Sequence, residues 1–257
     1  MKKAKVNLQT ISRSIQVLRC FDNEADLGIT DIAKQLGLAK STVFGIVSTL
    51  ECNGFLEQDS CTGRYRLGAE LFRLGTRVKA DLLSLCKPYM EKLVAAYRET
   101  VHLVIPDQCS ILYIHKIESP HSMRICSKVG ERQPLYCTGV GKAILAHLGE
   151  SDRKAITDKM NFVKLTPFTV GNMDTLSQEL AGIKAKGFAV DREELEVGLI
   201  CVAAPVFDSF DKPVAAISVA GPAIRMTDRV IEEIAGTLTA YTCELSGKLG
   251  YLQGACR

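Results

Sequence analysis

The hydrophobic period of the first 68 residues constrains the fold more than any other feature of this sequence. Apolar residues recur every three or four positions through three successive segments between residues 11 and 50, and this spacing predicts amphipathic helices. After Gly54 the period becomes two, first over residues 55–58 and then over residues 64–67. Turn-forming residues separate these two stretches, so they predict the two short strands of a hairpin.

The boundaries of the helical segments are predicted from their flanking residues. The second segment is expected to begin with Thr30 as its N-cap and to end at Gly37, which can adopt a left-handed conformation. The third follows a turn at residues 38–41 and ends at Asn53-Gly54. Two short helices around a glycine turn, followed by a hairpin, predict a winged helix-turn-helix. The side chains expected to face its core are Ile11, Ile15, Leu18, Phe21, Ile32, Ala33, Leu36, Val43, Val47 and Leu50.

A helix-turn-helix unit binds double-stranded DNA by placing its second helix in the major groove. The outward face of the third segment carries small or planar side chains that can approach base edges, and Lys40, Arg64 and Arg66 are expected to hold phosphates. Amphipathic helices around a glycine also occur in other helical domains, where basic residues only face solvent. The residues predicted to contact DNA are Thr30, Lys40, Ser41, Thr42, Phe44, Gly45, Ser48, Arg64 and Arg66.

The charge distribution supports DNA binding by this part of the chain. The whole sequence has a formal net charge of +3. Residues 1–80 hold 12 basic and 8 acidic residues, a net charge of +4, while the remaining residues hold 20 and 21, a net charge of −1. The positive excess therefore lies in the first third, where a polyanion would bind.

The length of 257 residues predicts one to two domains. We place a winged helix-turn-helix domain at residues 1–68, a linker helix at 69–82 and a second domain at 83–257. The apolar residues Leu71, Leu74, Val78, Leu82 and Leu85 recur along the linker at helical spacing. Such a stripe suits dimerisation, and the alternative is that it packs on its own domain. A further helix is expected from about Pro88 to Arg98.

The second part of the chain alternates strand-like and helix-like segments. Hairpin turns are expected at residues 107–110 and 208–212, so we predict an α+β domain with an antiparallel sheet. One helix is expected to begin with Thr175 as N-cap in a capping box with Gln178 and to stop at Gly187. The predicted strands are residues 101–105, 111–117, 123–129, 188–190, 200–207 and 214–219, and the predicted helices are residues 141–147, 151–159, 176–186 and 228–249.

A glycine-rich loop, Thr138-Gly-Val-Gly-Lys142, precedes one of these helices. It is not a phosphate-binding P-loop, because position 136 is Tyr and Ala143 follows the lysine. The loop still presents backbone N–H groups at the positive end of a helix dipole, which suits a carboxylate. A tight turn without a ligand is the alternative.

Catalytic and metal-binding patterns are weak. The four histidines have no metal-ligand spacing, no cysteine pair has C-x-x-C spacing, and there is no G-x-S-x-G. We expect no metal and no cofactor. Cys201 lies in an apolar strand and is more typical of packing than of a nucleophile. The longest apolar stretch, residues 199–207, is far below the ~20 residues that span a bilayer, and the N-terminus lacks an export signal. A cytoplasmic protein with mostly free thiols is expected.

The chain resembles the IclR family of bacterial transcription regulators over nearly its whole length. The blocks that carry the resemblance are residues 29–43 (ITDIAKQLGLAKSTV), 54–56, 65–68, 134–143 (PLYCTGVGKA), 187–194 (GFAVDREE), 198–206 (GLICVAAPV) and 217–222 (ISVAGP). Within the family, residues 113–117 and 134–136 are most similar to regulators of sugar-acid catabolism, such as the one sensing 2-keto-3-deoxygluconate.

The resemblance implies a winged helix-turn-helix, a linker helix and a GAF-like effector domain. It implies homodimers, often paired into dimers of dimers, on palindromic DNA operators, and most members are repressors. Effectors of the family are often small carboxylates or aromatic acids, so a small carboxylate is expected here, with a sugar acid as one candidate. The positions that map onto the effector pocket, together with neighbouring residues of the same motifs, are Thr138, Gly139, Val140, Gly141, Asp191, Cys201, Ser218 and Ala220.

Two departures from relatives affect these expectations. Many relatives carry Arg or His where this chain has Gly45, so their operator sequence does not transfer. Some glyoxylate-type members have a second Ser where this chain has Ala220. The prediction is an effector-responsive DNA-binding repressor that is not an enzyme. An activator, a cysteine-dependent enzyme using Cys201 and a pure protein-interaction module remain the alternatives.

Overall fold

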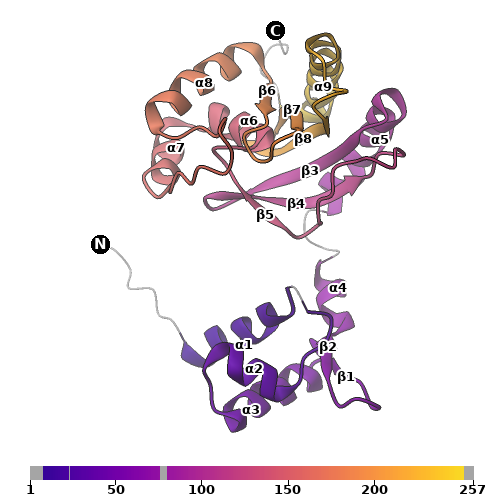
Figure 1. Ribbon diagram of the computed structural model, residues 1–257, viewed down its shortest axis with the longest axis vertical. Helices are drawn as coiled ribbons and strands as arrows, with labels where there is room; N and C mark the ends of the chain where they lie inside the picture. The colour runs from indigo at the N-terminus through magenta and orange to yellow at the C-terminus, as the bar shows by residue number, and fades with distance from the viewer. Residues whose placement is uncertain (1–7, 23, 76–79, 252–257) are drawn as a thin grey trace. The chain divides into compact units, whose positions relative to one another are not determined.

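The computed structural model describes residues 8–22, 24–75 and 80–251 (Figure 1). The chain divides into two compact units, Met1–Ala80 and Asp81–Arg257. Each unit has its own hydrophobic core. The α+β fold class and the antiparallel sheet predicted for the second part are confirmed.

The first unit is a winged helix-turn-helix, as the change of period predicts. Its helices are α1 (Gln9–Arg19), a short 3-10 turn η1 (Cys20–Asp22), α2 (Ile29–Leu36) and α3 (Lys40–Cys52). The wing pairs β1 (Leu56–Gln58) with β2 (Tyr65–Leu67) in antiparallel register. Leu27 forms an isolated bridge with Tyr65, which joins the start of the helix-turn-helix to the wing. The helix α4 (Ala69–Gly75) follows.

The core of this unit contains most of the apolar residues expected there, with one exception on α1. Val17 and Phe21 are buried, whereas Ile11 and Ile15 are 56% and 47% exposed. The prediction of Ile11 and Ile15 as inner-face residues is therefore wrong within this chain. The reason is that α1 contacts α3 and α2 through its C-terminal half, so the inward stripe runs through Val17 and Phe21.

The caps of α2 correct a second prediction. Gly37 has a φ of 63° and ends the helix in the left-handed conformation, as expected. The N-cap is Gly28 and not Thr30, which is the second residue of the helix. The Asp31 carboxylate accepts a 3.0 Å hydrogen bond from the Gly28 N–H, so the acid in the first turn stabilises the helix start.

The predicted linker stripe is divided between the two units. Leu74 on α4 is 40% exposed, while Leu82 on α5 (Ala80–Tyr97) is buried in the core of the second unit. Leu85 packs against the same core, so this half of the stripe packs on its own domain. Val78 lies outside the described residues. Pro88 is inside α5, so the separate helix expected from Pro88 is the second half of one helix.

The second unit is built on a six-stranded antiparallel sheet with the order β5-β4-β3-β8-β7-β6. Its hairpins β3–β4 and β7–β8 turn where the sequence predicts. The strands are β3 (Thr100–Asp107), β4 (Ser110–Ile117), β5 (Arg132–Pro134), β6 (Ala189–Arg192), β7 (Leu199–Phe207) and β8 (Pro213–Pro222).

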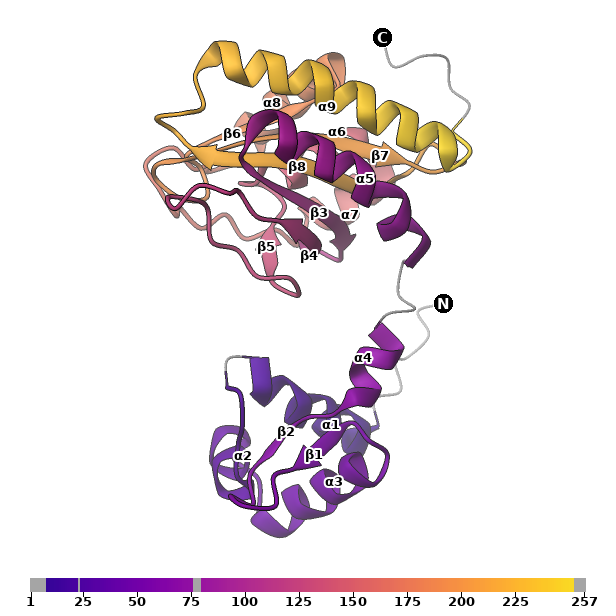
Figure 2. The same ribbon diagram turned by 90° about the vertical axis from the view of Figure 1, so that its right-hand side faces the viewer.

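Helices cover both faces of this sheet. On one face α5 and α9 (Asp228–Lys248) pack against the central strands, and on the other lie α6 (Gly139–His147) and α8 (Met173–Lys186), with α7 (Glu150–Thr157) beyond them (Figure 2). The central strands β7 and β8 are therefore buried on both faces, which explains their nearly continuous apolar sequence.

Two predictions in this unit are wrong. Residues 123–129 are not a strand, because β5 pairs with β4 and the carbonyls of Met123 and Ser127 accept hydrogen bonds from side chains instead. The helix α8 begins three residues earlier than expected. Its N-cap is Asn172, whose side chain accepts a 2.9 Å hydrogen bond from the Thr175 N–H. Gly187 ends it with a φ of 80°, as predicted.

Candidate functional site

The second unit contains a cavity of about 270 Å³ between the sheet and the start of α6. Its wall also includes parts of two loops. The β4–β5 segment (residues 118–131) contributes Ile125, Cys126 and Ser127, and the β6–β7 loop (residues 193–198) contributes Leu195 and Glu196. Of the eight residues predicted to form an effector pocket, the structure brings seven together here: Thr138, Gly139, Val140, Asp191, Cys201, Ser218 and Ala220.

Gly141 does not border the cavity and has a packing role. A Cβ at this position would lie 2.3 Å from the carbonyl oxygen of Leu135. Only glycine allows α6 to pass so close to this backbone. Gly141 thereby sets the position of the helix start without touching the cavity.

The strand register explains how residues far apart in the sequence share this wall. Asp191 on β6 pairs with Cys201 on β7, and Cys201 pairs with Ala220 on β8. Two residues along the same face, Ser218 pairs with His102 on β3. Because cross-strand partners point to the same side of a sheet, these side chains form two adjacent rows facing α6.

The start of α6 is held at the cavity by its cap. The Thr138 hydroxyl accepts a hydrogen bond from the Gly141 N–H at 3.1 Å and donates one to the Pro134 carbonyl at 2.9 Å. The amides of Gly139 and Val140, the first two residues of the helix, have no acceptor within it. They lie at the positive end of the helix dipole and can bind an anion.

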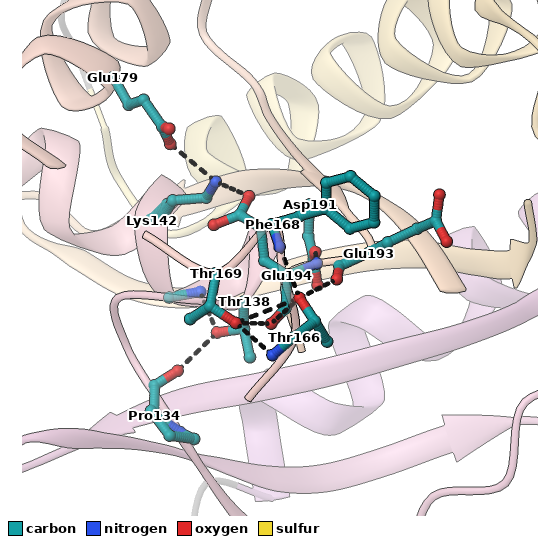
Figure 3. A network of polar contacts seen from close by, with 11 residues as sticks. Pro134, Thr138, Lys142, Thr166, Phe168, Thr169, Glu179, Asp191, Glu193 and Glu194 are labelled. Carbon is teal, nitrogen blue, oxygen red and sulfur yellow. Dashed lines mark hydrogen bonds and ion pairs between the residues drawn. The ribbon is translucent and has the colours of Figure 1, made fainter. Parts of the chain in front are cut away.

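Asp191, labelled in Figure 3, is a buried acid that borders the cavity. It is 1% exposed, and its Oδ1 accepts a 2.8 Å hydrogen bond from the Glu194 N–H, whereas its Oδ2 is buried without a partner among the described residues. Burial, reinforced by the charge of Glu194, raises the pKa of Asp191 to about 7. The carboxyl group is therefore near the midpoint of its titration at neutral pH.

A buried lysine fixes the β6–β7 loop behind Asp191. Lys142 is 1% exposed, and its Nζ forms ion pairs with Glu194 and, at 2.9 Å, with Glu179 on α8 (Figure 3). Burial by itself would lower the pKa of Lys142, but the two carboxylates outweigh it, and the pKa is raised. Lys142 therefore stays charged, and it is not among the residues that border the cavity.

Two threonines hold the same loop from outside. The Thr166 hydroxyl donates to the Glu193 carbonyl and the Thr169 hydroxyl donates to the Glu194 carbonyl, each at 2.7 Å. Since Leu195 and Glu196 border the cavity, these contacts fix one of its walls.

His102 was missed by the sequence analysis. It is 3% exposed, borders the cavity, and its Nε2 lies 2.8 Å from the Ser127 hydroxyl in the β4–β5 segment. Burial, with the charge of Lys116, lowers the pKa of His102 to about 4, so the ring is neutral at physiological pH. A lone histidine in an apolar strand gives no signal of this role, because its partner comes from an irregular segment.

Cys201 has no features of a nucleophile. Burial, with the nearby Asp191 carboxylate, raises the pKa of its thiol well above the ordinary value. The thiolate is the reactive form, so Cys201 acts as a half-buried wall of the cavity. Within the part of the chain that the structure describes, no group of three or more His, Cys, Asp or Glu residues could hold a metal ion.

The residues predicted to contact DNA lie on the first unit. Lys40, Ser41, Phe44 and Gly45 on α3 are exposed, and Thr42 and Ser48 on the same helix are partly exposed. Phe44 is 56% exposed, so its ring is accessible to a partner. Thr30 is exposed on α2.

The two arginines of the wing are already paired with acids. Arg64 forms ion pairs with Asp26 and, at 3.2 Å, with Asp31. Arg66 pairs at 3.1 Å with Glu57, its cross-strand neighbour. A phosphate would have to replace these carboxylates.

Comparison with known proteins identifies the protein family of this chain. Residues 10–60 match the IclR helix-turn-helix domain, and residues 76–246 match the family described as bacterial transcriptional regulator IclR C-terminal. The chain belongs to the IclR family of transcriptional regulators. The relatives found are transcriptional regulators, and this family is not enzymatic, which excludes the cysteine-enzyme alternative.

Individual relatives cover almost the whole of this IclR-family chain. It is 31% identical to the HTH-type transcriptional regulator KdgR of Escherichia coli over 98% of this chain and 96% of the relative. The crystal structure of the Thermotoga maritima IclR superimposes with a TM-score of 0.79 and 31% identity, covering 95% of this chain and 100% of that one. An IclR homologue from Microbacterium hydrocarbonoxydans, crystallised with 4-hydroxybenzoate, has a TM-score of 0.81 and 23% identity over 91% and 99% of the two chains, and shows the fold alone. In the described ranges no helix is both long and apolar enough to cross a membrane.

Proposed function

We propose that this chain is a repressor whose binding to a DNA operator is controlled by a small carboxylate in the cavity of the second unit. The observation that carries this proposal is the cavity itself. It combines the amide end of α6 with the buried Asp191 and Ser218 in a chain whose first unit is a helix-turn-helix. A cavity of about 270 Å³ is large enough for a molecule the size of a sugar acid. The similarity to KdgR and the 4-hydroxybenzoate bound by another homologue favour the same class of effector.

For the carboxylate we assign the position beside Gly139 and Val140. The first-turn amides of α6 provide the donors, and Thr138 fixes them in place. Asp191, Cys201 and Ser218 stand opposite and would contact the rest of the molecule. Ala220 leaves space where a larger residue would fill the cavity.

For DNA we assign the exposed face of α3. Ser41, Thr42, Phe44 and Ser48 would face the major groove, with the Phe44 ring suited to a thymine methyl group. Lys40 is an exposed cation available to a phosphate, and Arg64 and Arg66 would exchange their carboxylate partners for phosphates. Gly45 adds no side chain, and Thr30 on α2 could reach the backbone. A homodimer or a dimer of dimers on a palindromic site would present two such faces.

The experiment is to sequence the genomic DNA fragments that the full-length protein retains, with and without 2-keto-3-deoxygluconate and related sugar acids. The proposal predicts a small set of palindromic fragments that the effective acid releases. Retention of random fragments, or of the same fragments with every acid in the panel, would contradict it. An acid that increases retention would instead support the activator alternative.

A further inference from the structure

The cavity contains acids but no permanent cation. Among the described residues that border it, Glu131, Asp191 and Glu196 carry carboxyl groups, and none is Lys or Arg. Lys142 does not border the cavity and is paired with two glutamates. A carboxylate entering this space loses its hydration without gaining a fixed counter-charge, and uncompensated burial of charge is costly.

The amide end of α6 lies directly beside Asp191. A Cβ built on Gly139 would be 3.5 Å from the backbone nitrogen of Asp191 and 3.4 Å from the carbonyl oxygen of Cys201. An anion at the first-turn amides would therefore lie beside β6 at Asp191, whose side chain borders the same cavity and whose buried Oδ2 lacks a partner in the described part of the chain. Two carboxylates held in one small cavity repel each other, and sharing one proton relieves that repulsion.

We propose that a carboxylate effector enters this cavity together with one proton, which resides on Asp191 Oδ2 and forms a hydrogen bond to the effector carboxylate. This inference rests on the proposed function, because it concerns the same cavity. The proton comes from solvent and no covalent bond changes. The Asp191 carboxylate becomes a carboxylic acid, and its O–H donates a hydrogen bond to the effector carboxylate. The two groups together then carry a net charge of −1 instead of −2.

The groups around Asp191 are consistent with this assignment. The charge of Lys142 on α6 favours ionisation of Asp191, while the charge of Glu194 in the β6–β7 loop opposes it. Cys201 on β7, Tyr113 on β4 and Cys137 before α6 are also coupled to Asp191 electrostatically. The remaining titratable groups of the lining are His102, Cys126, Glu131 and Glu196.

His102 is the other candidate for the proton, but its surroundings disfavour the charged form. Its Nε2 already lies against the Ser127 hydroxyl, it is buried, and Lys116 is its cross-strand neighbour. These features lower the pKa of His102 to about 4, whereas the pKa of Asp191 is about 7. Protonation of Asp191 at neutral pH is therefore much easier.

Calorimetry in buffers of different ionisation enthalpy measures the protons taken up on binding. With full-length protein and 2-keto-3-deoxygluconate or 4-hydroxybenzoate as probe, we expect an uptake near one proton at pH 8 and an affinity that falls about tenfold for each pH unit above pH 7. Asp191→Asn is isosteric, permanently neutral and keeps a donor. It is expected to bind with no proton uptake and with an affinity that no longer changes between pH 7 and 9.

His102→Gln is the matched control, expected to change affinity while still taking up the proton. Uptake that persists in Asp191→Asn but disappears in His102→Gln would overturn the assignment, and so would a wild-type uptake of zero.

A second measurement needs no effector and separates this inference from the proposed function. The carboxyl carbon signal of Asp191, assigned by its loss in Asp191→Asn, can be followed by NMR as the pH changes. We expect it to titrate near neutral pH in the free protein. If it titrates in the ordinary range of aspartate, the inference fails even when a sugar acid binds and releases DNA. If Asp191 titrates near neutral pH but no carboxylic acid binds, the proposed effector class fails and the inference fails with it.

Discussion

The Nε2 atom of His102 lies 2.8 Å from the Ser127 hydroxyl, and this contact holds the β4–β5 segment against the cavity of the second unit. Lys116 Nζ donates to the carbonyl of the same serine, and Arg225 donates to the Met123 carbonyl at 3.0 Å. An irregular segment is thus fixed by side chains from β3, from β4 and from the turn after β8. Its position determines how the cavity is closed.

Removing the serine hydroxyl is expected to loosen this segment. Ser127→Ala deletes one hydrogen bond to a buried ring, which typically costs about 0.5–1.5 kcal/mol. We predict faster amide hydrogen exchange in residues 123–129 and a severalfold faster dissociation of the effector. Ser209→Ala, on the exposed β7–β8 turn, is the control and should change neither. Unchanged exchange in the segment would mean that the other two contacts suffice.

The lysine behind the cavity gives a prediction about stability. Lys142→Met leaves Glu194 buried without its partner, and breaking a buried ion pair in this way costs about 3–5 kcal/mol. Adding Glu194→Gln removes the uncompensated charge and should recover much of the loss. Glu179→Gln should cost less than about 1 kcal/mol, since that side chain is 38% exposed. Urea unfolding measures the free energy of unfolding of the two single variants and the double variant. Equal losses of this free energy in Glu179→Gln and Lys142→Met would contradict the ranking.

The pH dependence of stability follows from Asp191. Its folded-state pKa of about 7 is above the ordinary value of 3.8, so the native state binds more protons than the unfolded state between these pH values. The contribution of Asp191 to stability therefore falls as the pH rises from 4 to 7, by up to about 4 kcal/mol. Asp191→Asn should be more stable than the wild type at pH 8 and show a flatter profile. Equal stabilities of the two proteins at pH 8 would contradict the raised pKa.

The ion pair between Arg64 and Asp26 predicts the effect of charge on DNA binding. Asp26→Asn removes a negative charge and one of the two carboxylates that pair with Arg64, so DNA binding at low salt should become severalfold tighter. Arg64→Ala should weaken binding to all sequences and reduce the salt slope by about 1. Asp152→Asn makes the same charge change on the second unit and should have little effect. Fluorescence anisotropy at several salt concentrations tests these variants, and an unchanged slope in Arg64→Ala would exclude Arg64 as a phosphate contact.

The elements of the fold were largely predictable because they depend on local patterns. The change of period at Gly54 predicted the wing, and Gly37 and Gly187 marked helix ends because they adopt positive φ there. Most of the pocket residues named in advance line one cavity, since they lie in ordered motifs that resemble a known family. Whether they bind an effector stays a prediction.

The errors arose where a tertiary contact, or a better cap supplied by a neighbouring residue, decides the outcome. Residues 123–129 have the composition of a strand, but β5 occupies the edge that they would need. Thr30 and Thr175 are good N-cap residues, yet Gly28 and Asn172 cap the helices, because Asp31 and the Asn172 side chain supply the local hydrogen bonds. His102 could not be found because its partner Ser127 lies in a segment without a periodic pattern.

The central claim is that occupation of this cavity controls DNA binding by α3. The most direct test measures release of a retained operator fragment by 2-keto-3-deoxygluconate from the wild type and from Ala220→Leu, whose larger side chain would fill the cavity between Cys201 and the start of α6. We expect the two proteins to bind the fragment equally well without the acid. The acid should release the fragment from the wild type, and release from Ala220→Leu should need at least a tenfold higher acid concentration. Release of the fragment from both proteins at the same acid concentration would contradict this claim. So would the failure of every tested sugar acid to release the fragment from either protein.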